Sequence, residues 1–451
     1  MHRFDDRTEE IARLCFEYAI DRLRMDPVPL DRSLPLAALE TLAGTTITAA
    51  GRPPEDVMRL FADVLAPACI SSDSPRFLAF IPEAPTKASQ LFDVVVSASA
   101  IVGVSWLEAS GAVYAENQAL RWLADLAGLP ANAGGCFVSG GSAGNLSALV
   151  AARDAAETLR GGRPARWRVA LGDQAHSSLI STMRIMDVDP LVVPSDASER
   201  FTGNALRHAL DTDPEPDSVF AVVATAGTTN AGIVDDLDGL ASVARERDVW
   251  LHVDGAYGLA ALAAPSARPM FAGVDHADSL VVDPHKWLFA PFDCAALLYR
   301  DPELARHAHA QQAEYLDPIQ ARDEWNPSDY AYHLTRRVRG LPFWFSLAVH
   351  GTDAYSAAIE RTLAIARDAA VRIEAAPHTE LVHGPGLTVV LWRRRGWEAA
   401  DYAAWSERAL AEQRAFVVPT TWKGETVARA VFLHPECPPT VIDDVIDSMR
   451  D

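Results

Sequence analysis

Cysteine is scarce in this sequence. The 451 residues include five cysteines, which form neither a CxxC pair nor a Cys/His zinc pattern. They are widely spaced, at Cys15, Cys69, Cys136, Cys294 and Cys437. This usage predicts a reduced, cytoplasmic protein and gives no sign of a metal site.

Long apolar runs are absent as well. The most apolar stretch, residues 94–106, is too short to span a bilayer and is bracketed by Asp93 and Glu108. Residues 1–24 are charged throughout and lack the apolar centre of a signal peptide. We therefore expect no membrane partner, and we expect residues 94–106 to lie in the core.

Positive charge is in deficit. The chain carries 40 Lys and Arg against 61 Asp and Glu, a net charge of -21. This balance offers no basic surface for nucleic acid or for an anionic membrane. Any anion that the protein binds must be held by local geometry.

What the chain does have is a regular alternation of strand and helix patterns, which begins at Gly135. Short apolar runs typical of buried strands cover residues 136–139, 168–171, 191–194, 219–225, 249–254, 279–283 and 294–299. Helical patterns lie between most of them. The alternation predicts an α/β fold with a large, mostly parallel seven-stranded sheet that has helices on both faces.

The rest of the chain divides around this sheet. We predict an N-terminal helical segment at 1–75, a large α/β domain at 76–310, a mobile active-site loop at 311–335 and a small α+β domain at 336–451. The first segment has too little apolar surface to form its own core. We expect it to pack on the main body or on a partner subunit.

Lys286 lies in the most unusual stretch of the chain. Apolar runs flank Asp283-Pro-His-Lys286-Trp on both sides, and Pro284 ends the first run because it cannot donate to a strand ladder. Burial disfavours an ammonium group and makes a lysine amine nucleophilic enough to form a Schiff base. The ordinary alternative is a lysine that reaches from a strand end to water.

Four further segments follow other predicted strands. A glycine turn with Gly141 and Ser142 precedes a helix whose N-terminus can receive a phosphate, although it matches neither the P-loop nor the GxGxxG pattern. Asp254 ends a buried strand and needs a cationic partner. His176 and Thr229 follow two more strands. Each segment alone is also compatible with a turn, a salt bridge or a surface-loop histidine.

All five signals lie at the C-terminal ends of predicted strands, where open α/β sheets bind their ligands. One ligand uses all of them. A phosphate on a helix N-terminus, a cationic ring nitrogen opposite a carboxylate, an aldehyde for a lysine and a flat ring beside an imidazole describe pyridoxal phosphate. The set therefore predicts this cofactor.

The same segments resemble the motifs of a known family. They are Gly-Gly-Ser142, Asp-Gln-Ala-His176-Ser-Ser, Gly-Thr-Thr229, His-Val-Asp254-Gly-Ala-Tyr, Asp-Pro-His-Lys286-Trp and the following Phe-Asp-Cys-Ala. They are similar to the group II pyridoxal-phosphate decarboxylases, above all to the aromatic-L-amino-acid decarboxylase branch, from about residue 75 to residue 344. The resemblance implies the fold type I architecture and a homodimer with shared active sites.

The resemblance also implies roles. Lys286 would hold the cofactor as an aldimine, Asp254 would keep the pyridine nitrogen protonated, and His176 would stack on the ring. The other residues implied to contact the cofactor are Gly141, Ser142, Thr229, Ala256, Asp283 and His285. The implied reaction is decarboxylation of an L-amino acid, in first place an aromatic one, through a quinonoid to a primary amine and CO2.

Some implied positions depart from the family pattern. The positions assigned to the substrate are Phe80, Ile81, Pro82 and Val104. Ile81 and Val104 stand where the aromatic branch has more aromatic rings, and Asp283 stands where the family often has Asn. In the loop, Tyr330 is our preferred proton donor, with Tyr332 as the alternative.

Other activities stay open from the sequence. One is oxidative decarboxylation-deamination to an aldehyde, against which the presence of Tyr330 argues. Others are an aminotransferase or a carbon–carbon lyase of the same fold, but no C-terminal arginine motif for an α-carboxylate is recognisable. The last is a protein that binds the cofactor without catalysis, which the retention of Lys286, Asp254 and His176 argues against.

Overall fold

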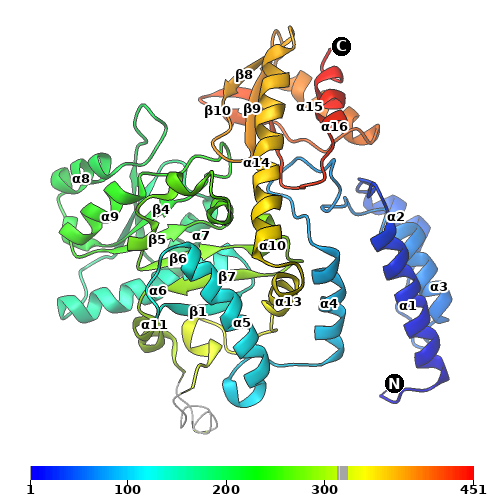
Figure 1. The fold of residues 1–451 in the computed structure, drawn as a ribbon, viewed down its shortest axis with the longest axis horizontal. Coiled ribbons are helices and arrows are strands. Elements are labelled where there is room, and N and C mark those ends of the chain that lie inside the picture. Colours follow the sequence, from blue (N-terminus) through cyan, green and yellow to red (C-terminus); the bar gives the residue numbers. More distant parts are fainter. Residues whose placement is uncertain (1, 312–313, 315–323, 451) are drawn as a thin grey trace.

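The computed structural model describes residues 2–311, 314 and 324–450. Its centre is a seven-stranded sheet in the order β1-β7-β6-β5-β4-β2-β3 (Figure 1). The strands are β1 (Gly134–Val138), β2 (Arg168–Gly172), β3 (Asp189–Val193), β4 (Val219–Thr225), β5 (Trp250–Asp254), β6 (Ser279–Val282) and β7 (Ala295–Tyr299). Only β7 runs against its neighbours β1 and β6. The predicted mostly parallel seven-stranded sheet is confirmed.

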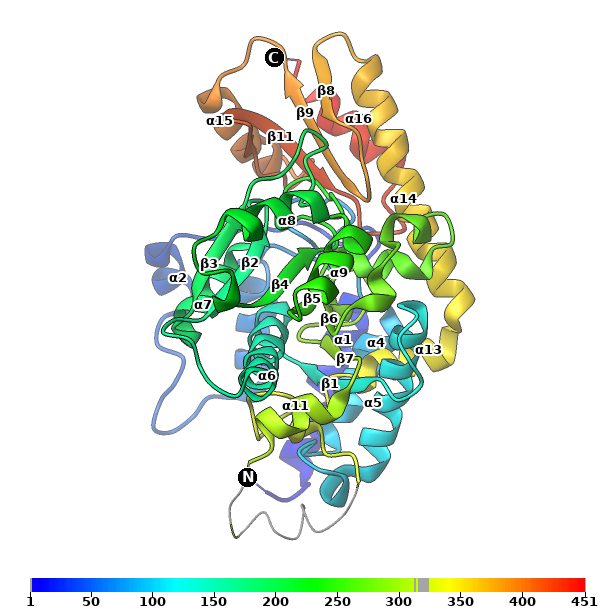
Figure 2. The same cartoon turned by 90° about the vertical axis from the view of Figure 1, so that its left-hand side faces the viewer.

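Helices cover both faces of this sheet (Figure 2). On one face lie α6 (Gly141–Arg160), α7 (Ser177–Met186) and α11 (Pro302–His309). On the other lie α5 (Trp106–Leu126), α8 (Gly203–Thr212) and α9 (Leu237–Glu246). Because both faces are covered, strands such as β4 are buried along their whole length, as their continuous apolar sequence requires.

The C-terminal part forms a second, antiparallel sheet in the order β10-β11-β9-β8. Its strands are β8 (Thr379–His383), β9 (Val389–Arg394), β10 (Thr420–Trp422) and β11 (Glu425–Val431). The helices of this part are α13 (Leu341–His350), α14 (Thr352–Ala375), α15 (Ala399–Ala411) and α16 (Pro439–Asp447). In Figure 1, α14 runs from the large sheet domain up to this smaller sheet, so that it joins the two layers.

The N-terminal helices stand apart from the rest of the chain (Figure 1). They are α1 (Asp6–Arg24), α2 (Leu36–Ala43) and α3 (Pro54–Leu60), and a π-helical turn, Phe61–Leu65, continues α3. None of the described side chains in these three helices is buried. An ion pair of 2.7 Å between Arg22 and Asp73 is one of the few ties to the body.

The expectation that residues 94–106 lie in the core is confirmed for one side of the segment and wrong for the other. Residues 94–98 belong to α4 (Lys87–Ala98), which packs on α13 along one side only. Val94, Val95 and Val102 are exposed, whereas Val96 and Val104 are buried. The segment is apolar on both sides, and the single chain covers only one of them.

Part of the predicted loop lies outside the described residues. Its described end contains a 3-10 turn, Pro327–Tyr330. The domain boundaries at 75, 310 and 335 stay predictions. Among the described residues, no helix combines the length and the apolar character needed to cross a bilayer.

Candidate active site

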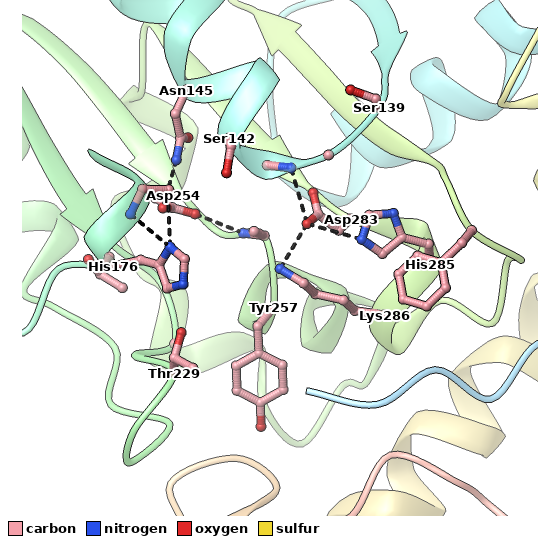
Figure 3. A pocket seen from close by; sticks show the side chains of 17 residues that line it. Ser139, Ser142, Asn145, His176, Thr229, Asp254, Tyr257, Asp283, His285 and Lys286 are labelled. Carbon is pink, nitrogen blue, oxygen red and sulfur yellow. Dashed lines mark hydrogen bonds and ion pairs between the residues drawn. The ribbon is translucent and has the colours of Figure 1, made fainter. Parts of the chain in front are cut away.

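A cavity of about 340 Å³ lies at the C-terminal ends of several strands of the large sheet (Figure 3). The structure brings every residue that the motifs assigned to the cofactor to its wall: Gly141, Ser142, His176, Thr229, Asp254, Ala256, Asp283, His285 and Lys286. These residues come from separate strand ends and loops. Six of the seven strands run in one direction, so their C-terminal ends meet at a single edge.

Lys286 is held by the carboxylate that precedes it by three residues. The short helix α10 (Pro284–Trp287) brings Lys286 Nζ to 2.8 Å from Asp283 Oδ2. The backbone N–H of Gly141 donates to the same oxygen at 3.2 Å. Asp283 is 1% exposed, and its Oδ1 has no hydrogen-bond partner among the described residues. A carboxylate therefore lies at the N-terminus of α6, where an anion is favoured.

His285 forms part of the same wall. Its Nδ1 accepts from the Cys294 N–H at 3.0 Å, and its Nε2 lies 3.5 Å from Asp283 Oδ2. Burial lowers the pKa of His285, and the Asp283 carboxylate opposes that effect. Because Nδ1 accepts, the Nε2 nitrogen carries the proton and is directed at Asp283.

Asp254 has different partners. Its Oδ2 accepts from Asn145 Nδ2 at 2.9 Å, and its Oδ1 accepts from the Ala256 N–H at 3.2 Å (Figure 3). Both donors are neutral amides, and no ion pair joins Asp254 to a described side chain. A buried carboxylate without a cation suits a ligand that brings a positive charge to it.

His176 caps α7 at the mouth of the pocket. Its Nδ1 accepts from the Ser178 N–H at 3.2 Å and lies 2.8 Å from Ser178 Oγ. These two contacts fix the imidazole, and the residue is exposed in this chain. The ring is therefore placed to lie against a flat ligand.

These residues fit pyridoxal phosphate. At Gly141 a Cβ would lie 2.9 Å from Ala256 Cβ, so the turn before α6 needs glycine to keep its N–H groups open to an anion. Lys286 offers an amine for the aldehyde, and Asp254 offers an unpaired negative charge for the ring nitrogen. Asp283 is the exception, since its charge has the same sign as the phosphate.

Comparison with known proteins agrees with this chemistry. The family model described as the pyridoxal-dependent decarboxylase conserved domain matches residues 39–395. The chain belongs to this family. It is thus a pyridoxal-phosphate-dependent amino acid decarboxylase with the fold type I architecture.

Three similar proteins illustrate the relationship. The aromatic-L-amino-acid decarboxylase of Bacillus atrophaeus is 32% identical over 327 residues, 71% of this chain and 68% of that protein. The L-2,4-diaminobutyrate decarboxylase of Rhizobium meliloti (strain 1021) is 33% identical over 371 residues, 79% and 73% of the two chains. The structure of the Oryza sativa TDC with PLP and tryptamine superposes with a TM-score of 0.90 at 25% identity and covers 100% of both chains.

Tyr330 is not brought to the pocket. Its side chain is 3% exposed, stacks on Trp325 with ring centroids 4.2 Å apart, and accepts from Tyr299 Oη through its backbone carbonyl. Burial raises the pKa of the Tyr330 hydroxyl well above its usual value. Within this chain Tyr330 is a core residue, and its assignment as proton donor stays a prediction.

The four positions assigned to the substrate also lie outside the pocket wall. Phe80 is 58% exposed, adopts φ of 52°, and packs beside Phe77 and Phe416 instead. Ile81, Pro82 and Val104 do not line the pocket either, and Val104 is buried. Within one chain these residues do not contact the cavity.

The structure adds residues that the motifs did not single out. Asn145 and Tyr257 line the pocket, and His252 lies behind Asn145. Arg429 of β11 is 5% exposed and donates to the Thr229 carbonyl, and no carboxylate pairs with it among the described residues. Burial lowers the pKa of Arg429 to about 10. A lone arginine within an apolar strand was the signal that could have found it.

Proposed function

We propose that the protein converts an L-amino acid with an aromatic side chain into a primary amine and CO2. The observation that carries the proposal is the convergence of Lys286, Asp254 and His176 on one cavity at the N-terminus of α6. The similarity to aromatic-L-amino-acid decarboxylases supports the substrate class.

Pyridoxal phosphate, when bound, supplies an aldehyde for the substrate amine and a protonated ring that accepts the electron pair of the breaking Cα–carboxylate bond. Lys286 Nζ would bind that aldehyde between turnovers. The Asp254 carboxylate would face the ring nitrogen, and the N–H groups at Gly141 and Ser142 would receive the phosphate. The exposed side of His176 would cover the ring and exclude water from it.

Arg429 suits the substrate carboxylate. Its guanidinium is buried beside Thr229, which lines the pocket, and has no acidic partner among the described residues. A guanidinium binds a carboxylate through two parallel hydrogen bonds. We assign Arg429 to orientation of the amino acid rather than to the chemistry.

A second substrate class is an amino acid with a cationic side chain. Glu83 Oε1 accepts from Ser72 Oγ at 2.6 Å, while its buried Oε2 has no hydrogen-bond partner among the described residues. Burial raises the pKa of Glu83 to about 7. A diaminobutyrate decarboxylase is among the similar proteins, so an ammonium group is a natural partner for this carboxyl.

We infer that the active form is a homodimer in the cytoplasm. Apolar side chains of the N-terminal helices face outward, and a second copy would cover them: Ile11, Phe16, Ile20, Val57 and Phe61. All five cysteines are unpaired, as in a reducing compartment. The double variant Ile11→Asp/Phe16→Asp should therefore be monomeric by light scattering. A dimer in that variant would contradict the assigned interface.

The test of the activity is a product survey. Purified protein with pyridoxal phosphate is incubated in air with each common L-amino acid, L-dopa, ornithine and 2,4-diaminobutyrate, and products are identified by mass spectrometry. An aromatic amine and CO2 are expected, and a diamine would select the second class. Aldehyde, ammonia and peroxide would show the oxidative reaction instead. The Lys286→Ala variant is the control that should form no product.

A further inference from the structure

Five buried side chains form a continuous hydrogen-bonded chain that ends on Asp254. Trp250 Nε1 donates to Ser279 Oγ at 2.8 Å, and Ser279 Oγ lies 2.8 Å from His252 Nδ1. His252 Nε2 lies 2.9 Å from Asn145 Oδ1, and Asn145 Nδ2 donates to Asp254 Oδ2 at 2.9 Å. Of the five, Asp254 and Asn145 line the pocket, whereas the other three lie behind the wall.

The local structure explains why these residues meet. Trp250, His252 and Asp254 alternate along β5, so their side chains point to the same face of the sheet. Ser279 of β6 is the residue paired with His252 in the parallel ladder. Asn145 lies one turn into α6, which covers this face. Strand period, register and helix position therefore build the chain together.

The direction of the hydrogen bonds in this chain is fixed from the Asp254 end. An indole N–H only donates, so the Ser279 hydroxyl accepts from Trp250 and keeps its own proton for a further bond. An ionised carboxylate only accepts, so Asn145 turns its NH2 to Asp254 and its carbonyl to His252. The His252 proton is then on Nε2. Nδ1 of the neutral ring is then an acceptor, so the Ser279 hydroxyl donates to it.

The histidine stays neutral in this position. Burial lowers the pKa of His252 to about 4, although the Asp254 charge acts in the opposite direction. A neutral imidazole with one donor and one acceptor nitrogen completes the chain without an unpaired polar atom. An apolar core at these positions would avoid the cost of burying five polar groups, so their presence calls for a reason beyond packing.

We propose that His252 and Asn145 are positioning residues for the cofactor, which fix the Asp254 carboxylate toward the ring nitrogen. This inference rests on the proposed role of Asp254. His252 holds the Asn145 amide in one orientation, and that amide occupies one lone pair of Oδ2. The Ala256 N–H occupies one lone pair of Oδ1. The carboxylate cannot rotate without breaking both bonds, and its remaining lone pairs are left for the ring N–H.

The test compares two variants of His252 by cofactor binding to the apoenzyme. In His252→Phe, nothing donates to Asn145 Oδ1, so the amide is free to turn and Asp254 loses its fixed direction. In His252→Gln, the side-chain amide can accept from Ser279 and donate to Asn145, which preserves the order of the chain. We expect the dissociation constant of pyridoxal phosphate to rise about tenfold or more in His252→Phe. In His252→Gln it should return most of the way to the wild-type value.

A cofactor analogue separates positioning from general damage. In the carbocyclic analogue a CH group replaces the ring nitrogen, so Asp254 has no ring N–H to meet. His252→Phe should weaken binding of pyridoxal phosphate but leave binding of the analogue within about twofold of wild type. Equal weakening of both ligands would overturn the proposal. If wild type bound both ligands equally well, the assigned role of Asp254 itself would fail, and that outcome is distinct.

The chain offers a matched control and a second variant. His309 is also buried and bonds to α6 through the Ser147 carbonyl at 2.9 Å, outside the hydrogen-bonded chain. His309→Phe should leave the binding ratio of the two ligands unchanged, and a change as large as that of His252→Phe would overturn the proposal. If His252→Phe does not fold, Ser279→Ala removes the bonds of the hydroxyl to His252 and Trp250 and keeps the bond between His252 and Asn145. Ser279→Ala should weaken binding of pyridoxal phosphate less than His252→Phe does, and it should likewise leave binding of the analogue unchanged.

Discussion

Replacement of Asp283 by Asn should strengthen cofactor binding. The Asp283 carboxylate now lies at the N-terminus of α6, where Gly141 N–H and Lys286 Nζ both contact its Oδ2. A phosphate at the same helix end would meet a charge of the same sign. An Asn at this position keeps an oxygen for the two donors and puts an NH2 group where the unpartnered Oδ1 now lies.

The size of the effect follows from the charges. At an effective dielectric of about 20, two unit charges about 4–7 Å apart repel by about 2–4 kcal/mol. The α6 dipole and the neighbouring N–H groups stabilise both anions, the Asp283 carboxylate and the phosphate, and so offset part of this repulsion. Lys286 must also leave Asp283 before it binds the aldehyde. This breaks an ion pair in wild type but not in Asp283→Asn, where residue 283 carries no charge. We therefore expect Asp283→Asn to lower the cofactor dissociation constant by at least about tenfold, or about 1.4 kcal/mol.

The assay is titration of apoenzyme with pyridoxal phosphate, followed by absorbance. Asp293→Asn is the matched control, because Asp293 lies on the neighbouring loop, outside the pocket wall, and pairs with Arg339 at 3.0 Å. Asp293→Asn removes the same charge, and we expect it to change the cofactor dissociation constant by less than about twofold. Weaker binding in Asp283→Asn would refute the reasoning, since it would mean that Asp283 is protonated and donates to the phosphate.

Three further predictions concern the other polar groups of the site. Lys286→Ala should abolish turnover and leave the circular dichroism spectrum unchanged. Asp254→Asn should lower kcat about 10²–10³-fold, because one amide oxygen cannot accept from both Asn145 and Ala256 and the charge is lost; an unchanged kcat would remove its assigned role. The pKa of His252 is about 4 in the folded protein and 6.5 for a free histidine, so between these pH values the unfolded state binds more protons than the folded state. As the pH falls from about 7.5 to 5, the free energy of unfolding measured with urea should therefore drop by roughly 2 kcal/mol more in wild type than in His252→Gln. Equal drops in the two proteins would contradict this.

The sequence predicted the sheet, and the residues that it assigned to the cofactor line one cavity, for the same physical reason. Buried parallel strands are continuous apolar runs, so a polar residue such as Asp254 or Lys286 stands out where a run ends. Chain direction then places those ends at one edge. His252 and Asn145 could have been found by the same logic. His252 shares a strand face with Asp254, and Asn145 follows Gly141 by one helical turn.

The other assigned residues do not line the pocket of this chain, because their environment depends on contacts far along the chain. Tyr330 follows a polar segment, yet it packs on Trp325 in the core behind β1. Phe80 packs beside Phe77 of its own segment, but its other ring partner, Phe416, lies over 300 residues away. Residues 94–106 are apolar in sequence, but no element of the described chain covers their outer side. Composition reports how apolar a segment is, not which molecule covers it.

Loss of charge at the two pocket carboxylates, Asp254 and Asp283, should change cofactor binding in opposite directions. Asp254 is bound by neutral amides whose direction is fixed from behind, so it presents a charge that the pocket leaves unpaired. Asp283 already has the Lys286 ammonium, and it occupies the helix end that an anionic ligand needs. Loss of the first charge should therefore weaken cofactor binding, and loss of the second should strengthen it. Changes of the same sign would mean that total charge, rather than the partners of each carboxylate, governs binding.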